Sequence, residues 1–317
     1  MAVGGLLLGL ALLGFGADHL TDATASLARR LNAPEHVVGL LTAGGEWEEL
    51  VVVGLAVAGG HPGLAIGNVI GSCIANLIGS MPLGFFGEKP VVPDRSARAS
   101  ALVLLLVTAV AVGFLADGGV TRPEGGLLVG LFVAYAGSIL LVIRRGWLRP
   151  PEPDEDDDDR AMLGTVGVLR LVALAVGAVV VLAAGADLVV SGGVALAERV
   201  GLSDYAIGAT IVAVGTTLPD KAISWKGGRL GHGGVVTANA AGSNIFVLTL
   251  ILGVAALTSP TVLTVAPAIL RVDLPLLLLA TLLVALLFRR PSLHRGTGSL
   301  LLALYAAYLA FALVRGV

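Results

Sequence analysis

Charged residues, aromatic residues and cysteine are all scarce in this sequence. Charged residues fill 13% of the 317 positions and aromatic residues 5%, whereas a soluble domain carries about 25% charged residues. Hydrophobic residues reach 56%, with a mean hydropathy of +0.94. This balance excludes an ordinary soluble domain and predicts an integral membrane protein with the lipid bilayer as a partner. The single cysteine, Cys73, excludes internal disulfides.

Recognisable catalytic motifs are also missing. The sequence has no glycine-rich nucleotide loop and no nucleophile–base constellation. We therefore expect no enzyme activity, no cofactor and no nucleic-acid partner, and nothing in the sequence indicates an obligate protein partner.

Long apolar runs dominate what is present. They lack the alternation of period two that is typical of outer-membrane barrels, so they predict helices. A helix needs about 20 apolar residues to cross a bilayer, and the sequence offers ten such segments. We expect them at residues 3–27, 37–58, 63–85, 100–116, 125–143, 163–197, 206–227, 233–257, 274–288 and 300–314. The first and sixth are long enough to tilt strongly.

An internal repeat divides these ten segments into two sets of five. Residues 16–18 recur as 185–187, and residues 71–72 recur as 242–243, with Asn68 answered by Asn239. An odd number of spans per copy places the two copies in opposite orientations. The fold class predicted is an all-α membrane protein of two inverted five-helix repeats, with helices two and seven interrupted. The predicted boundaries are residues 1–146, an acidic linker at 147–162, and residues 163–317.

Basic residues predict the orientation in the membrane. The connections after odd-numbered spans hold most of the arginine and lysine, whereas the opposite connections hold only Arg122, Arg199, Arg271 and Arg315. Basic loops stay in the cytoplasm. We therefore expect a multi-pass protein of the plasma (inner) membrane with both termini outside the cytoplasm and the acidic linker inside.

The stretch from Val212 to Asp220 combines an acid with a helix break. A carboxylate at mid-bilayer costs roughly 2.5–3.5 kcal/mol, so Asp220 indicates a functional site. Pro219 lacks a backbone donor and frees carbonyls one turn earlier, near Ala213 and Gly215. Carbonyls, hydroxyls and a carboxylate are all ligands of hard cations, which predicts a cation site.

The first half carries a matching acidic stretch. With the 171-residue offset of the later repeat, Glu49 falls opposite Asp220. Glu46 shares a helix face with Glu49 and is a further candidate ligand, whereas Glu48 points elsewhere. With Lys221, these acids give a formal charge of −3, which cannot be maintained in low dielectric without cations or protons.

Three motifs together resemble the calcium/cation antiporter superfamily. Gly-Thr-Thr-Leu-Pro-Asp at 215–220, Gly-Ser-Asn-Ile-Phe at 242–246, and Gly-Asn-Val-Ile-Gly-Ser at 67–72 with Asn76 are similar to its signatures. The resemblance implies ten spans in two inverted halves, with Glu49 and Asp220 as bridging carboxylates. It also implies a wider ligand set, namely the side chains of Thr216, Thr217, Ser72, Ser243 and Asn76 and the carbonyls of Ala213 and Thr42.

Several residues depart from the superfamily pattern. The first signature reads Gly-Gly-Glu-Trp-Glu-Glu at 44–49 and lacks the hydroxyls and the proline. Val247 stands where the family has an acid or amide, and Lys221 follows Asp220 directly. These changes argue against an intact set of sodium sites and favour proton coupling or a different cation.

The resulting prediction is a secondary active antiporter that works by alternating access. It would exchange calcium or another divalent cation for sodium or protons, with inorganic cations as substrates and no bound cofactor. Three alternatives remain open: a proton-coupled antiporter of a different cation, an intramembrane enzyme using paired acids, and a relative that no longer transports.

Overall fold

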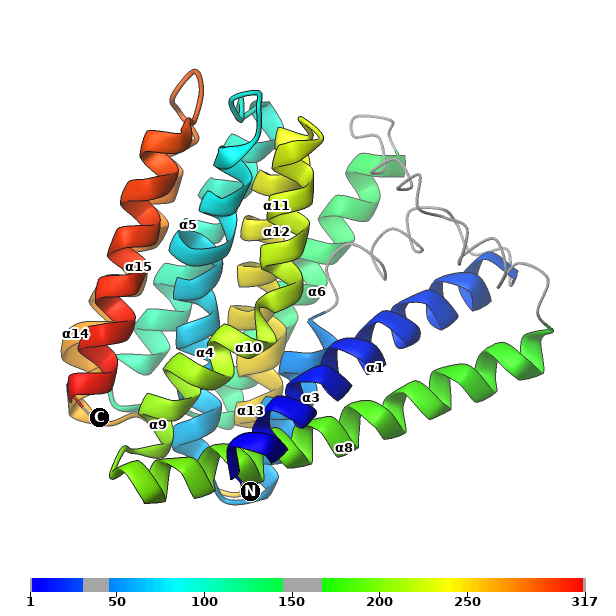
Figure 1. Cartoon of the computed structure of the whole chain (residues 1–317), viewed down its shortest axis with the longest axis vertical. Helices are drawn as coiled ribbons and strands as arrows, with labels where there is room; N and C mark the ends of the chain where they lie inside the picture. The colour runs from blue at the N-terminus through cyan, green and yellow to red at the C-terminus, as the bar shows by residue number, and fades with distance from the viewer. Residues whose placement is uncertain (1, 31–45, 145–166, 316–317) are drawn as a thin grey trace.

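The computed structural model describes residues 2–30, 46–144 and 167–315, and most of them are helical (Figure 1). The α-helices are α1 Ala2–Arg30, α3 Trp47–Ala58, α4 Pro62–Ile74, α5 Arg95–Leu115, α6 Arg122–Arg144, α8 Val168–Val200, α9 Asp204–Ile207, α10 Ala213–Thr216, α11 Leu218–Arg229, α12 Gly233–Phe246, α13 Leu252–Thr258, α14 Pro267–Leu287 and α15 Arg295–Arg315. The π-helical segments are η1 Ala75–Ser80, η3 Gly208–Val212 and η4 Val247–Ile251, and η2 Met81–Phe86 is a 3-10 helix.

Among the described residues, strand structure is limited to short pieces in two connections between helices. β1 Gly119–Val120 pairs antiparallel with β2 Leu263–Thr264, and a single bridge joins Val91 to Leu293. These two-residue strands lie between helices and leave the architecture helical, as the composition predicts.

Eight helical segments of the described residues are long and apolar enough to cross a membrane. The second and seventh of the ten expected spans, which were predicted to be interrupted, are not among these eight. The predicted second span is described only from residue 46, where it forms the 12-residue helix α3. The predicted seventh span is broken at Thr217, between α10 and α11, because Pro219 and the preceding threonines disturb the helical hydrogen bonds there.

The helices α1 and α8 form a long, inclined pair across one face of the molecule (Figure 1). They span 29 and 33 residues, which agrees with the expected length. Glycines let their backbones approach, since a Cβ on Gly9 would lie 2.8 Å from the Gly185 carbonyl oxygen. Small residues of this kind are typical of close helix packing in lipid.

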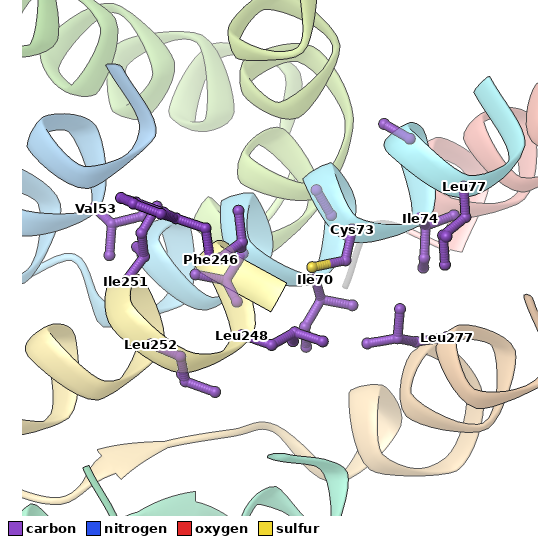
Figure 2. Packing of buried hydrophobic residues seen from close by; sticks show 14 of the residues in the cluster. Val53, Ile70, Cys73, Ile74, Leu77, Phe246, Leu248, Ile251, Leu252 and Leu277 are labelled. Carbon is purple, nitrogen blue, oxygen red and sulfur yellow. The ribbon is translucent and has the colours of Figure 1, made fainter. Parts of the chain in front are cut away.

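The centre of the molecule is built on α4 and η1. Figure 2 shows Ile70, Cys73 and Leu77 facing Leu248 of η4 and Leu277 of α14. Cys73 is fully buried in this core. The same helix also approaches the second half closely at Gly67 and Gly71, where a Cβ would lie 2.4 Å from the carbonyl oxygens of Tyr205 and Ala209 respectively.

Local backbone features recur at the 171-residue spacing of the sequence repeat. Gly60 and Gly231 both adopt positive φ, at 81° and 77°. The residues that follow, His61 and His232, cap α4 and α12 with similar backbone angles. The π-helical segments η1 and η4 begin one residue away from this spacing, at Ala75 and Val247.

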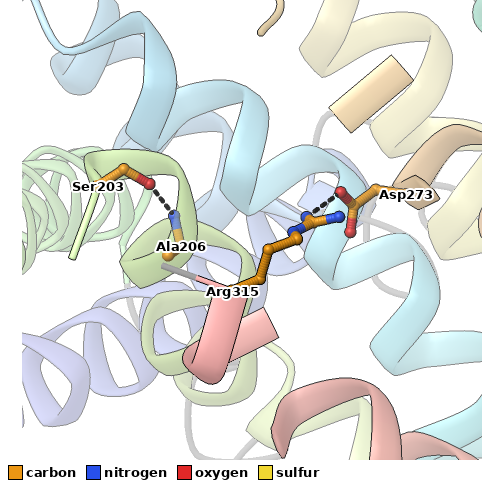
Figure 3. Close-up of polar contacts among 4 residues, drawn as sticks. All are labelled: Ser203, Ala206, Asp273 and Arg315. Carbon is orange, nitrogen blue, oxygen red and sulfur yellow. Dashed lines mark hydrogen bonds and ion pairs between the residues drawn. The ribbon is translucent and has the colours of Figure 1, made fainter. Parts of the chain in front are cut away.

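Basic residues gather in connections at one end of the helices. The connections 87–94, 230–232 and 289–294 lie together at the top of Figure 1, and they contain or adjoin the lysines and arginines that the sequence assigns to one side. Arg315 belongs to the opposite set, but its guanidinium donates to the buried carboxylate of Asp273 (Figure 3). Its charge is therefore neutralised within the protein. In the same region Ser203 caps α9 by accepting from the Ala206 amide at 3.1 Å (Figure 3).

Candidate functional site

A cluster of buried polar side chains lies where α3, α4, η1, α10, α11 and α12 meet, and we name it the central polar cluster. Its members are Glu46, Glu49, Asn68, Ser72, Asn76, Thr216, Thr217, Asp220, Asn239, Ser243 and Asn244. All except the half-buried Asn239 are at most 6% exposed. Burying a polar group costs free energy unless it is paired, so such a concentration indicates a binding site.

Glu49 is the fully buried acid of α3. Its Oε1 accepts a hydrogen bond from the Thr216 hydroxyl at 3.1 Å, across from one half of the chain to the other. The same hydroxyl lies 3.3 Å from Asn68 Oδ1 and 3.4 Å from Ser72 Oγ. Because a hydroxyl carries one hydrogen, the oxygens of Glu49 and Asn68 compete for it, whereas the Ser72 hydroxyl can donate or accept. The polar groups around Thr216 thus hold more acceptor oxygens than that hydroxyl can satisfy.

Asp220 occupies the first turn of α11, directly after Pro219. A helix N-terminus favours a carboxylate through its exposed N–H groups and dipole. One oxygen, Oδ1, accepts from Asn239 Nδ2 at 2.7 Å and from Ser243 Oγ at 3.0 Å. Two helices, α11 and α12, therefore fix this carboxylate in place.

Glu49 and Asp220 each have a second carboxylate oxygen that differs from the first in its surroundings. Glu49 Oε2 and Asp220 Oδ2 are buried, and neither has a hydrogen-bond donor among the described residues. The charges of Glu49, Asp220 and Glu46 lie close enough to interact electrostatically. Several buried acids with acceptor oxygens left over form an environment that a cation or a proton would stabilise.

The acids do not form a site by themselves. Within the part of the chain that the structure describes, no three side chains of histidine, cysteine, aspartate or glutamate converge as a metal site. A cation here would need hydroxyl, amide and carbonyl oxygens to complete its shell. Oxygen-only coordination of mixed type suits sodium and calcium better than the metals that prefer nitrogen or sulfur ligands.

Thr217 and Ala213, two of the predicted ligands, are engaged at the helix break. The Thr217 hydroxyl donates to the Ala213 carbonyl at 2.6 Å. The Lys221 ammonium donates to the Thr217 hydroxyl and to the carbonyls of Val214 at 3.2 Å and Thr217 at 3.3 Å. The lysine thus contacts one oxygen that the sequence assigned to a cation, the Thr217 hydroxyl.

The structure brings most predicted site residues into the central polar cluster. Glu46, Glu49, Ser72, Thr216, Asp220 and Ser243 all lie within it, and Asn76 accepts from Ser80 Oγ at 3.3 Å. Glu48 is also buried, although the helix periodicity directs it away from Glu49. Thr42 lies outside the described residues. Val247 is a buried apolar residue at the start of η4.

Three asparagines lie in the cluster although they were not predicted as site residues. Asn68 lies beside Thr216, Asn239 donates to Asp220, and Asn244 donates to the Cys73 carbonyl at 2.9 Å. Their signal is present in the sequence, since an amide within an apolar span needs a partner, and Asn68 and Asn239 are related by the repeat.

Trp47 falls opposite Leu218 of the second half, so a bulky aromatic ring stands where the repeat has leucine. Its ring packs edge-on against Phe246 with 6.4 Å between the ring centroids, and the rings of Phe246 and Phe132 pack with 5.2 Å between their centroids. Trp47 therefore extends the apolar wall beside the acids.

Known proteins resemble this chain over nearly its whole length. The family model described as sodium/calcium exchanger protein matches residues 1–141 and 170–314. CaxA of Alkalimonas amylolytica, an antiporter by provisional name, is 33% identical over 317 residues, covering 96% of each chain. An uncharacterized membrane protein of Methanocaldococcus jannaschii is 31% identical, covering 98% of this chain and 97% of its own.

A solved structure matches the fold as well. The sodium–calcium exchanger NCX_Mj, soaked with 10 mM Na⁺ and 10 mM Sr²⁺, superposes with a TM-score of 0.64 at 29% identity. The match covers 98% of this chain and 97% of that one. The family model and the solved structure describe exchangers, and CaxA is named as an antiporter, so the alternative of an intramembrane enzyme with paired acids is set aside.

Proposed function

Because the chain belongs to the sodium/calcium exchanger family, we propose that it is an antiporter that exchanges a divalent cation, foremost calcium, for sodium or protons by alternating access. One observation carries the proposal: Glu49 and Asp220, from opposite halves of the chain, lie buried in one polar cluster, each with an oxygen that lacks a donor among the described residues. A mobile cation would supply the missing positive charge.

In this proposal the cation lies between Glu49 and Asp220. The hydroxyls of Thr216, Ser72 and Ser243 and the amide of Asn76 complete the shell, with Glu46 as a further acid. The carbonyls of Ala213 and Thr42 and the side chain of Thr217 are the remaining proposed ligands. The transported cations act as substrates, and no resident cofactor takes part.

Coupling follows from the cost of an empty site. With both acids ionised and no cation present, a change between outward-open and inward-open states would carry unneutralised charge through a low-dielectric interior. Only the protein with a bound cation or proton changes between the two states at a low free-energy cost. A ligand shifts a conformational equilibrium by its differential affinity for the two states. We assign the sliding element to α1 and α8, whose glycine-lined contact forms a long pair of its own.

We also propose the finer architecture that the sequence predicts. The chain would form ten membrane helices in two inverted five-helix repeats, residues 1–146 and 163–317, joined by a cytoplasmic acidic linker. The recurrence of Gly60 and His61 as Gly231 and His232 supports the repeat. The basic connections at one end support a plasma membrane protein with both termini outside the cytoplasm.

Uptake by proteoliposomes tests the function. Calcium accumulation should follow an outward sodium or proton gradient, and the variants Glu49→Gln and Asp220→Asn should abolish it. Asp117→Asn, which changes an exposed acid beyond the end of α5, should leave uptake unchanged. Uptake that survives both site variants would refute the proposed site.

Proton coupling is the second candidate, favoured by the apolar Val247 in η4 and by the extra acid Glu46 in the cluster. Calcium uptake that proceeds without sodium and collapses with a protonophore would establish it. Uptake that needs sodium and ignores the protonophore would exclude it.

A further inference from the structure

The side chain of Lys221 points back toward the helix break that precedes Asp220. Its ammonium donates to three oxygens, namely the Thr217 hydroxyl and the carbonyls of Val214 and Thr217. Pro219 has no N–H, so the helix cannot satisfy all of its own carbonyls at this point. The ammonium is a donor to the Val214 carbonyl at the break, whereas the Thr217 carbonyl also accepts from the Lys221 backbone N–H at 3.1 Å.

Lys221 is not held as an ordinary ion pair. Among the described residues, no carboxylate lies within ion-pair distance of its ammonium nitrogen, although the charges of Asp220 and Glu49 act on it at longer range. Its immediate shell is one hydroxyl and two carbonyls. Neutral oxygens of this kind, with acids just beyond, are also the surroundings that suit a bound sodium ion.

An ammonium can take the place of such an ion. It is a compact point charge with three donors, and it matches a monovalent cation in charge and in the number of oxygens it can engage here. The difference is that it cannot leave, since its four-carbon stem joins it to α11.

We propose that Lys221 is a tethered cation that permanently fills one monovalent position beside Asp220, so that fewer sodium ions are bound and moved for each divalent ion. This inference rests on the proposed antiporter function. It also explains why position 247 holds an apolar valine, because a chain that binds fewer mobile sodium ions needs fewer ligands in η4.

Removing the tethered charge should open the position to a free ion. In proteoliposomes, calcium uptake by Lys221→Gln should depend more steeply on sodium than uptake by the unaltered protein, with a Hill coefficient higher by about one, the charge equivalent of one ammonium. Sodium should also raise the melting temperature of purified Lys221→Gln more than that of the unaltered protein, with choline as the salt control.

Two matched variants separate charge from other effects. Lys226→Gln changes an exposed lysine on the same helix and should leave the sodium dependence unchanged. Lys221→Arg keeps the charge and should retain the sodium dependence of the unaltered protein. The same gain of sodium dependence in Lys221→Arg as in Lys221→Gln would overturn the inference.

The remaining outcomes of these experiments also support or overturn the inference. Should Lys221→Gln unfold in sodium-free buffer, sodium must restore its folding where choline does not, and restoration by neither overturns the inference. An unchanged Hill coefficient and an unchanged sodium effect on melting would also overturn it. An unaltered protein that moves no cation would refute the antiporter function, whereas sodium binding gained in Lys221→Gln would still support the tethered cation.

Discussion

The Thr216 hydroxyl on α10 donates to a carboxylate oxygen of Glu49 on α3 at 3.1 Å. The two residues are 167 positions apart in the chain, and both are almost completely buried. This hydrogen bond connects the broken helix of the second half with the acid of the first half. Thr216 therefore contacts the principal acid of the other half directly.

Thr216→Ala should weaken divalent-cation binding. A hydrogen bond to a charged group contributes about 1.5–3 kcal/mol, which corresponds to a loss of affinity of roughly ten- to a hundredfold. Titration calorimetry with calcium measures the affinity of the purified variant and of the unaltered protein. Thr216→Ser keeps the hydroxyl and should bind nearly normally, and equal losses in both variants would contradict a role for the hydroxyl.

Asp220→Asn should remove the stabilisation that bound cations give. A ligand that binds the folded state raises its melting temperature, so a scan of calcium, strontium, magnesium and sodium at two pH values identifies the ions bound by the unaltered protein. Any ion that stabilises Asp220→Asn equally well is bound elsewhere. The same scan on Asn239→Ala tests whether the amide that donates to Asp220 Oδ1 contributes to affinity.

Gly71→Ala should destabilise the protein, whereas the repeat-related Gly242→Ala should not. A Cβ on Gly71 would lie 2.4 Å from the Ala209 carbonyl oxygen, but a Cβ on Gly242 meets nothing within 4 Å. Overpacking a core costs typically about 1–3 kcal/mol. Melting temperatures in detergent compare the two, and equal stability of the variants would show that α4 can move away from η3.

Arg315→Gln should also destabilise the fold. It leaves the fully buried carboxylate of Asp273 without its partner (Figure 3), and breaking a buried pair costs about 3–5 kcal/mol. The double variant Arg315→Gln with Asp273→Asn should recover much of the loss, since no charge stays buried. A double variant as unstable as the single one would indicate that packing, and not charge, is responsible.

Much of the architecture could be predicted because the bilayer imposes local rules. A segment in lipid must satisfy its backbone hydrogen bonds internally, so the apolar runs 100–116 and 300–314 predict the helices observed as α5 and α15. Pro219 predicts the break that separates α10 from α11, and the recurrence of residues 71–72 at 242–243 predicts two related halves. None of these conclusions needs knowledge of which helices touch.

The pairing of side chains across helices was decided only by the tertiary structure. The proximity of Asn68 to Thr216, the bond from Asn239 to Asp220 and the packing of Trp47 on Phe246 depend on how α3, α4, α10 and α12 cross. The sequence allows Lys221 to pair with a carboxylate or with carbonyls of its own broken helix. In the structure its ammonium donates to the carbonyls. Sequence spacing places residues along a helix, but the partner of a buried polar group is chosen by packing between distant segments.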